Sequence, residues 1–462
     1  MKQFLMIVCL VMIGSACAMP DLPSPEMATP MPDAFDVAGT PVYLPLDHPW
    51  WTVFDDPRLN AVVASALQKN LSIVQAVEKV VQAREVLQQQ KAARLPGLEA
   101  SADARRNRSL TGAFSTVASV GLSAAYEVGF WGRIHASEAS AAYLAQAGEY
   151  DLQTLYMTLA GEVVQLYMQC LYLSRLEELT RNQVVIAKNQ RDALRRRYET
   201  GLSELSDVLA AESSLVTAKA ALPGIVSDRR IVQHALQVLT GEWPESSTVS
   251  DPDPLPDVPL LMPGGLPSEI VYQRPDIRAA FFRIQSADRN VAAAVAERFP
   301  RFRLTGGIGH NWTQSAGPTL DGMVWNLGAG ITGPVLDWGQ RKSAVQQRAS
   351  MYRSQVAAWQ ESVLTAFQEI ADALSQNERS EAVVALRESQ LETAQKDYRL
   401  TARRYEMGLS TYSDLLAAEQ AVNTVTSTLL SASYTLLTDR ILLAKRTGGD
   451  WTKAVAEARL NR

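Results

Sequence analysis

Apolar residues recur at helical spacing through most of the chain. Between residues 134 and 197 there is no proline, and the apolar positions follow one another at alternating intervals of four and three residues. These positions are Leu152, Tyr156, Leu159, Val163, Leu166, Cys170 and Leu173. Such intervals form the seam of a coiled coil, so we expect a long helix that packs along a partner helix. Because Cys170 lies on this seam, we interpret it as a core residue.

The spacing changes to two residues in the stretches 97–130 and 301–337. Each stretch predicts a β-hairpin with one apolar face, and its strands of about ten residues also have the length of transmembrane β-strands. The same pattern occurs in half-buried hairpins of soluble domains, so the strands alone leave both readings open. The small residues Gly307, Gly309, Gly328 and Gly330 are expected on the opposite, inner face.

A turn-like motif occurs twice. "RYETGLSELSDVLAAE" begins at Arg197 and "RYEMGLSTYSDLLAAE" begins at Arg404, and 12 of the 16 positions are identical. Gly201 and Gly408 can each end a helix in the left-handed conformation. Ser203 and Ser410 can each cap the helix that follows. We therefore predict two helical hairpins and a structural duplication of the whole chain.

The duplication sets the expected domain boundaries. The first repeat, 58–250, would contain helices 58–94, 133–197 and 204–239 around the hairpin 97–130. The second repeat, 267–447, would contain helices 267–298, 340–404 and 411–446 around the hairpin 301–337. A proline-rich linker, 251–266, would join the repeats, and 448–462 would form a C-terminal tail. A helix of roughly 65 residues is about 98 Å long. Two of the shorter helices placed end to end would have a similar length.

The N-terminus has the features of an export signal. Lys2 precedes an apolar run from Phe4 to Gly14, which predicts a signal peptide over residues 1–16. The tetrapeptide "GSAC" resembles a lipobox and predicts lipid attachment at Cys17, although cleavage after Ala18 is a second possibility. Residues 17–57 would then form an extended anchored segment. No later stretch reaches about 18 consecutive apolar residues, so no further membrane helix is expected.

Composition narrows the function classes. The 44 Lys and Arg residues nearly balance the 49 Asp and Glu residues, so nucleic acid is not an expected partner. The chain has only 4 His and 3 Cys, and its acidic residues are spread along the helices rather than gathered in one pocket. We expect no enzyme activity, no cofactor and no metal site.

The number of predicted strands suggests that several copies of the chain assemble. Two hairpins leave open sheet edges, whereas a membrane tolerates only closed barrels, which begin at about eight strands. Two chains would give eight strands and a filled interior, so a through-channel requires three chains and twelve strands. The expected fold class is mainly α with a β-barrel part. An exported coiled-coil structural or adhesion lipoprotein without a pore is the alternative.

Several further stretches carry a family resemblance. They are "CAMPDLPSP" (17–25), "WWTVFDDPRLNAVVASALQKNLSI" (50–73), "LTGEWP" (239–244), "GLPSEIVYQRPDIRAA" (265–280), the two "GLS" turns and "TGGDW" (447–451). In their order and spacing the chain resembles the TolC-like outer membrane factors, in the lipoprotein branch that serves resistance-nodulation-division efflux pumps. The resemblance implies a homotrimer in the outer membrane, lipid-anchored and extending into the periplasm. It implies a twelve-stranded barrel continued by a twelve-helix tunnel, a periplasmic adaptor and an inner-membrane pump.

The resemblance also assigns roles to residues at the helical turns. Gly201, Leu202 and Ser203, with Gly408, Leu409 and Ser410, would contact the adaptor. Asp207 and Asp414 would form acidic rings at a periplasmic gate, with Glu204 as a third candidate. A first-turn carboxylate stabilised by the helix dipole explains the same two aspartates equally well.

Overall fold

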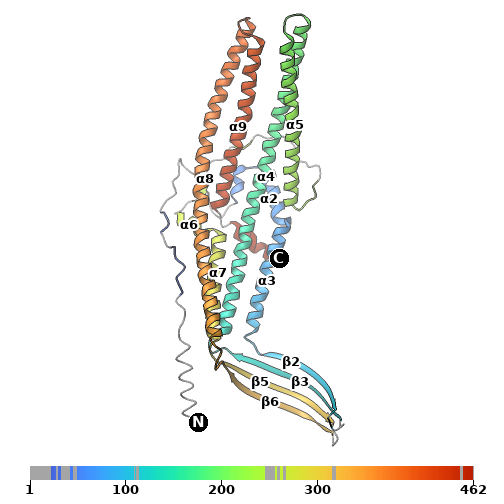
Figure 1. Ribbon diagram of the computed structural model, residues 1–462, viewed down its shortest axis with the longest axis vertical. Helices are drawn as coiled ribbons and strands as arrows, with labels where there is room; N and C mark the ends of the chain where they lie inside the picture. The colour runs from blue at the N-terminus through green and yellow to red at the C-terminus, as the bar shows by residue number, and fades with distance from the viewer. Residues whose placement is uncertain are drawn as a thin grey trace. The chain divides into compact units, whose positions relative to one another are not determined.

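The computed structural model describes residues 22–27, 30–32, 42–44, 49–108, 110, 114–244, 255–256, 261–263, 267–314, 319–447 and 451–460 (Figure 1). The signal peptide, Cys17 and most of the predicted linker 251–266 lie outside these residues. The chain divides into two compact units, which we call the sheet unit and the turn unit. The sheet unit comprises Met1–Thr29, Glu78–Asp151 and Asp276–Ser362, and the turn unit comprises Pro30–Val77, Leu152–Pro275 and Val363–Arg462.

The sheet unit contains one four-stranded antiparallel sheet in the order β2-β3-β5-β6. The strands are β2 (Gly97–Arg108), β3 (Phe114–Val128), β5 (Arg301–Gln314) and β6 (Leu320–Thr332). Both predicted hairpins are present, and pairing of β3 with β5 joins them into one sheet. Strands β2 and β6 are the two edges, and each pairs on one side only within the described residues.

The two faces of this sheet differ in chemistry. The register places Leu122 beside Ile308 and Ile308 beside Trp325, so the apolar positions of neighbouring strands share one face. The large side chains of this face are well exposed; they are Leu98, Val120, Leu122, Leu304, Ile308, Met323, Trp325, Leu327 and Ile331. Gly307, Gly309, Gly328 and Gly330 alternate with them and lie on the opposite face, as the strand periodicity predicts.

Helices of the sheet unit meet the sheet at an aromatic corner. They are part of α3 (Leu71–Ala92), the first part of α4 (Arg133–Glu199), α7 (Pro275–Ala296) and the first part of α8 (Gln340–Glu406). The indole of Trp131 stacks on Phe299 at 4.6 Å and its Nε1–H donates to the Pro300 carbonyl at 2.7 Å. This contact fixes the end of the first hairpin against the start of the second.

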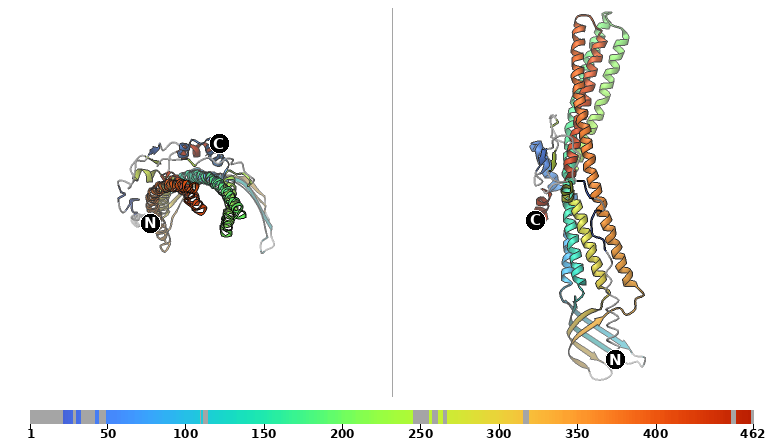
Figure 2. Two further views of the ribbon diagram at one scale, coloured as in Figure 1. Left: turned by 90° about the horizontal axis from the view of Figure 1, so that it is seen from above. Right: turned by 90° about the vertical axis from the view of Figure 1, so that its left-hand side faces the viewer.

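The turn unit contains two helical hairpins. Helix α4 turns back into α5 (Leu205–Leu239), and α8 turns back into α9 (Tyr412–Thr447). Figures 1 and 2 show the two hairpins side by side, and Tyr172 of α4 stacks on Tyr434 of α9 at 4.5 Å. Cys170, Leu173 and Val232 form a buried cluster where α4 meets α5, as the coiled-coil seam predicts.

The rest of the turn unit packs around the two hairpins. It includes β1 (Val42–Leu44), the 3-10 helix η1 (Trp50–Phe54), α2 (Pro57–Lys69), β4 (Leu261–Pro263), α6 (Pro267–Gln273) and α10 (Trp451–Leu460). Strands β1 and β4 pair in parallel, which joins the N-terminal segment to the segment between the repeats. Trp51 packs edge-on against Trp451 at 4.7 Å, so α10 is held close to η1.

The structure divides three predicted segments differently. The helix expected over 58–94 is two helices, because the Asn70 Oδ1 accepts the N–H groups of Ser72 and Ile73 and so caps a new helix. The helix expected over 267–298 breaks at Arg274, because Pro275 disfavours helical geometry in the residue before it. The predicted tail 448–462 contains α10.

Among the described residues, α5 is the one helix long and apolar enough by composition to cross a membrane. The count of consecutive apolar residues missed it, because serines and threonines interrupt the apolar positions. Leu215, Val232 and Leu236 of α5 are buried, as expected for a coiled-coil helix.

Candidate functional site

The two helical turns have the same backbone geometry. Gly201 and Gly408 take φ angles of +73° and +71°. The N–H of Leu202 donates to the Arg197 carbonyl at 2.8 Å, and the N–H of Leu409 donates to the Arg404 carbonyl at 2.7 Å. This pair of left-handed glycines and six-residue bonds is the Schellman helix end, so the prediction that both glycines end a helix is confirmed.

Each turn presents one large apolar side chain to solvent. Leu202 is 70% exposed and Leu409 is 65% exposed. An exposed leucine is common on any surface, but here it recurs at the same position of two duplicated turns. The shared position marks the turns as a candidate contact surface for another protein.

The caps of α5 and α9 are not the predicted serines. Ser203 instead donates to the Asp207 carboxylate at 2.9 Å, and Ser410 donates to the Thr401 carbonyl at 3.3 Å. The caps are Glu204 and Thr411, one residue later in each turn. The prediction of serine caps is therefore wrong, because the left-handed glycine and the two residues after it complete the turn before the new helix begins.

Asp207 and Asp414 are the third residues of their helices and bond back to the cap residues. The N–H of Glu204 donates to Asp207 at 3.3 Å, and the N–H of Thr411 donates to Asp414 at 2.9 Å. The hydroxyl and then the N–H of Thr411 lower the pKa of Asp414 below its usual range. Both aspartates therefore stabilise the start of a helix. This is the role that the sequence offered as the alternative to a gate.

A groove of about 950 Å³ lies between the two turns, within the turn unit. Leu202, Ser203, Glu204 and Asp207 line it from the first turn. Gly408 and Ser410 line it from the second turn, so the structure brings six predicted residues together. Gly201, Leu409 and Asp414 belong to the same turns but are not part of its lining.

Polar residues that the repeated motif did not mark as functional connect the two hairpins at this groove. The Arg197 guanidinium donates to the Tyr405 hydroxyl at 2.5 Å, and Gln190 donates to Glu419. Arg197 and Tyr405 belong to the repeated "RYE" tripeptides, one from each repeat. The repeated tripeptide could have indicated this contact, but only if the arginine of one copy had been paired with the tyrosine of the other.

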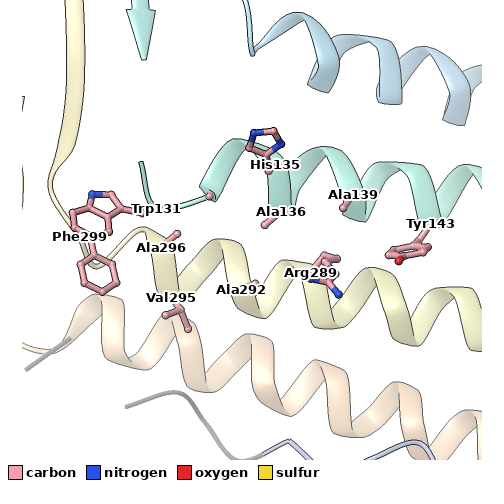
Figure 3. A pocket seen from close by; sticks show the side chains of 11 residues that line it. Trp131, His135, Ala136, Ala139, Tyr143, Arg289, Ala292, Val295, Ala296 and Phe299 are labelled. Atoms are coloured by element: carbon pink, nitrogen blue, oxygen red, sulfur yellow. The ribbon is translucent and has the colours of Figure 1, made fainter. Parts of the chain in front are cut away.

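A second pocket, of about 700 Å³, lies in the sheet unit between the start of α4 and the end of α7 (Figure 3). Trp131 and Phe299 lie at one end, while His135, Tyr143 and Arg289 contribute the charged or polar side chains. Val295 and small alanines of both helices line most of the remainder. It holds no nucleophile beside a base, which is the arrangement that covalent catalysis requires.

Metal-ligating side chains do not cluster within the described residues. Across the part of the chain that the structure describes, no group of three or more His, Cys, Asp or Glu residues could hold a metal ion. Cys170 is buried, and burial raises the pKa of its thiol to about 11. It therefore behaves as a core residue and not as a reactive thiol.

Comparison with known proteins identifies the fold and its use. The family model for outer membrane efflux proteins matches residues 62–242 and 266–449. The pyoverdine export outer membrane protein OpmQ of Pseudomonas aeruginosa is 27% identical, with 87% of each chain covered. The cation efflux system protein CusC of Escherichia coli is 27% identical, covering 96% of this chain and 98% of CusC.

Solved structures of outer-membrane channels have the same fold as this chain. The outer-membrane channel OprN superimposes with a TM-score of 0.84 at 27% identity, covering 94% of this chain and 99% of OprN. The open-state MtrE outer membrane channel of Neisseria gonorrhoeae gives a TM-score of 0.80 at 26% identity, covering 94% of this chain and 98% of MtrE. The chain therefore belongs to the outer membrane efflux protein family and is an outer-membrane channel component of an efflux system.

Proposed function

We propose that three copies of this chain form one export duct through the outer membrane. The four-stranded sheet, with its two free edges and its exposed apolar face, is the observation that supports this most directly. Three sheets would close into a twelve-stranded barrel with the apolar face toward lipid, and the helices would continue it as a twelve-helix periplasmic tunnel. A coiled-coil adhesin without a pore would have no use for such an exposed apolar face.

Closure is required because lipid offers no partner to the backbone groups of an edge strand. Two copies would give eight strands, whose barrel interior side chains fill. Three copies give twelve strands, and the small residues Gly307, Gly309, Gly328 and Gly330 would then face a wider interior. The number of copies is open to direct measurement.

The mass of the purified protein in detergent tests this proposal. Light scattering, with the mass of bound detergent subtracted, should give three times the mass of one chain. A mass of two chains would replace the duct by a filled eight-stranded barrel. A mass of one chain would leave the sheet edges open and would contradict the proposal.

We propose that Cys17 carries the lipid and that residues 17–57 tether it to the protein. Residues 22–27 support this, because they contact the first part of α8 within the sheet unit. The hydroxyl of Tyr352 donates to the Pro23 carbonyl at 2.8 Å, and the Gln360 amide donates to the Glu26 carbonyl at 2.7 Å. Labelled palmitate should enter the native chain and not a Cys17→Ala variant; equal labelling of both would exclude Cys17.

We propose that the turn groove receives a periplasmic adaptor, which connects the duct to an inner-membrane resistance-nodulation-division pump. The support is the groove itself, with Leu202 and Leu409 exposed at its turns. Leu202 lines the groove and Leu409 is exposed on the second turn beside it, so one adaptor segment could bury both leucines. The glycines hold the turns in the shape that presents them.

We propose that Asp207 and Asp414 also gate the duct, with Glu204 as a weaker third member. In a trimer each aspartate would recur three times and form an acidic ring. For Asp414 the capping bonds and a gating role are compatible, because the bonds from Thr411 favour the charged form of its carboxylate. The charge would favour cations or hold cross-chain pairs.

The chain itself would conduct drugs or other toxic compounds passively and would catalyse no reaction. The energy for transport would come from the inner-membrane pump. Deletion of the chain, followed by a panel of drugs, dyes, solvents and metal salts, would identify the exported class. A deletion strain with unchanged susceptibility to every member of the panel would contradict this role.

A further inference from the structure

The apolar face of the sheet ends in two arginines near the tip of the first hairpin. The register places Ala102 beside Val120, so the even-numbered residues of β2 belong to the apolar face. Along β2 this face begins at Leu98, continues through three alanines and ends with Arg106 and Arg108. The two arginines therefore extend the face that the proposed duct turns toward lipid.

The change from apolar to polar occurs at one level in three neighbouring strands. Arg106 of β2 pairs with Thr116 of β3, and Thr116 pairs with Gln314 of β5. The row two residues nearer the helices is apolar and consists of Ala104, Ala118 and Trp312. A polar row that borders an apolar row with an aromatic residue is typical of the interface between a bilayer and water.

The length of β2 agrees with an interface at this level. Arg106 follows Gly97 by nine residues, which span about 30 Å at about 3.3 Å per residue. Strands of outer-membrane barrels tilt by about 35–45°, so the rise along the barrel axis is about 23 Å, and the apolar band of such barrels is about 25 Å tall. Because the helices extend into the periplasm, Arg106 and Arg108 would lie at the outer surface of the membrane.

A shared aromatic ring holds the two guanidinium groups together. Phe114 of β3 is directly opposite Arg108 in the register. The centre of its ring lies 4.8 Å from the guanidinium carbon of Arg106 and 5.5 Å from that of Arg108. Such contacts are attractive, because the face of an aromatic ring is negative. Both arginines are exposed, so the pair is ordered and accessible at once.

The acidic residues of the sheet do not balance this pair of charges. Glu99 and Asp103 of β2 are odd-numbered and lie on the opposite face, and so does Glu127 of β3. Within the four described strands, Asp321 of β6 is the one acidic residue on the apolar face. Its Oδ1 lies 3.2 Å from Nδ1 of His310, and β5 and β3 separate it from β2. The arginine pair therefore presents a positive charge toward the membrane surface.

We propose that Arg106 and Arg108 bind the phosphate groups of a lipid in the outer leaflet, an inference that rests on the proposed duct and adds a lipid partner to it. A guanidinium matches the geometry of phosphate oxygens and bonds to two of them at once. The two Cα atoms are about 6.6 Å apart along the strand, so both side chains can reach one phosphorylated headgroup. The apolar residues of the same face would contact the acyl chains. A soluble polyphosphate would lack these contacts, which favours a lipid as the occupant.

Lipid binding by the purified full-length protein in detergent tests this site. Native mass spectrometry, with diphosphoryl lipid A as the probe, gives the affinity from the bound fraction. Arg106→Gln with Arg108→Gln removes two positive charges at the membrane surface, so the affinity should fall roughly tenfold or more. Inorganic pyrophosphate at the same phosphate concentration should leave the lipid bound. Displacement of the lipid by pyrophosphate would overturn a lipid-specific site.

Arg105→Gln is the matched control. It removes the same charge from the adjacent residue, whose side chain belongs to the opposite face. Arg105→Gln should keep native affinity for lipid A, whereas Arg106→Gln alone should lose roughly fivefold. An equal loss in these two single variants would attribute binding to net charge and overturn the proposal. Native affinity in the double variant would overturn it as well.

Light scattering and pore currents distinguish this inference from the proposed duct. A double variant that is trimeric, conducts and binds lipid A with native affinity would exclude the lipid site and leave the duct intact. A native protein that is monomeric and conducts nothing would overturn the duct and the lipid site with it.

Discussion

At the scale of single residues, the turns depend on two glycines in the left-handed region. Gly201 and Gly408 both have φ near +70°, and a Cβ at either position would meet no atom within 4 Å. The constraint is therefore the backbone conformation and not the available space. Gly224 provides a contrast, because it lies inside α5 with the same open surroundings and without a positive φ.

Alanine at these positions should have opposite effects on stability. Gly201→Ala places a side chain in the left-handed conformation and should destabilise the chain by about 1–2 kcal/mol. Gly224→Ala removes a flexible residue from a helix interior and should stabilise it by about 0.5–1 kcal/mol. Denaturant unfolding in detergent measures both. Equal effects from the two substitutions would mean that the turn is not held in this shape.

The thiol of Cys170 should be unreactive in the native protein. It is buried in the α4–α5 contact, and its raised pKa of about 11 leaves almost no thiolate at pH 8. A maleimide should label it only after unfolding. Rapid labelling at pH 8 in the folded protein would contradict a core position.

At the scale of elements, the sequence pattern was sufficient for the long helices and both hairpins. The predicted helix 133–197 corresponds to α4 and 340–404 to α8, because long stretches without proline and with a regular seam have few alternatives. The helix breaks were harder to predict. Asn70 caps α3 through its side chain, but the apolar spacing of Leu59, Val63, Ala66 and Ile73 continues across this position, so periodicity alone shows no break.

The candidate site was also predictable only in part from local sequence patterns. The turns and their glycines follow from the repeated motif, whereas the assignment of the caps required the backbone path around Gly201 and Gly408. The bond between Arg197 and Tyr405 joins residues 208 positions apart. Such a pair depends on how the two hairpins pack, which local periodicity does not contain.

The exposed leucines of the turns should determine coupling to the adaptor. Leu202→Ala with Leu409→Ala removes two apolar contacts from one surface, each worth roughly 1–2 kcal/mol, so adaptor binding should weaken at least tenfold. Leu202→Met with Leu409→Met keeps the apolar volume and is the matched control. Adaptor affinity and drug susceptibility are the two measurements. Alanine variants with native affinity would exclude the leucines as contacts.

The acidic residues of the turns should affect the pore through charge. Asp207→Ala with Asp414→Ala should change single-channel conductance and cation preference in a bilayer. Thr411→Ala removes the hydroxyl that donates to Asp414 and accepts its N–H, but leaves the backbone N–H of residue 411 and the carboxylate, so it should weaken the cap and keep native cation preference. If this control reproduces the aspartate variants, capping and not charge explains them.

Acidification should act in the same direction as removal of the carboxylates. The bonds from Thr411 lower the folded-state pKa of Asp414 below its usual 3.8. Its contribution to stability is therefore present above about pH 4 and is lost as the pH falls through the lowered value. The protection of the amides of residues 412–415 against exchange, relative to the intrinsic rate at each pH, should fall only below this pH. A loss of protection already at pH 6 would show that another group controls the turn.

At the scale of the whole molecule, one duplication accounts for the sheet, the turns and the proposed assembly. Each repeat supplies a hairpin to the sheet and a turn to the groove, so three chains would place six of each around one axis. The apolar face of the sheet, exposed in one copy, would become the lipid-facing surface of the barrel.

The central claim is that copies of this chain enclose a conducting path, and single-channel recording tests it most directly. Purified protein added to a planar lipid bilayer should give uniform current steps. Detergent from cells that lack the chain should give none. Protein that inserts into the bilayer but never raises the current above this control would contradict the claim.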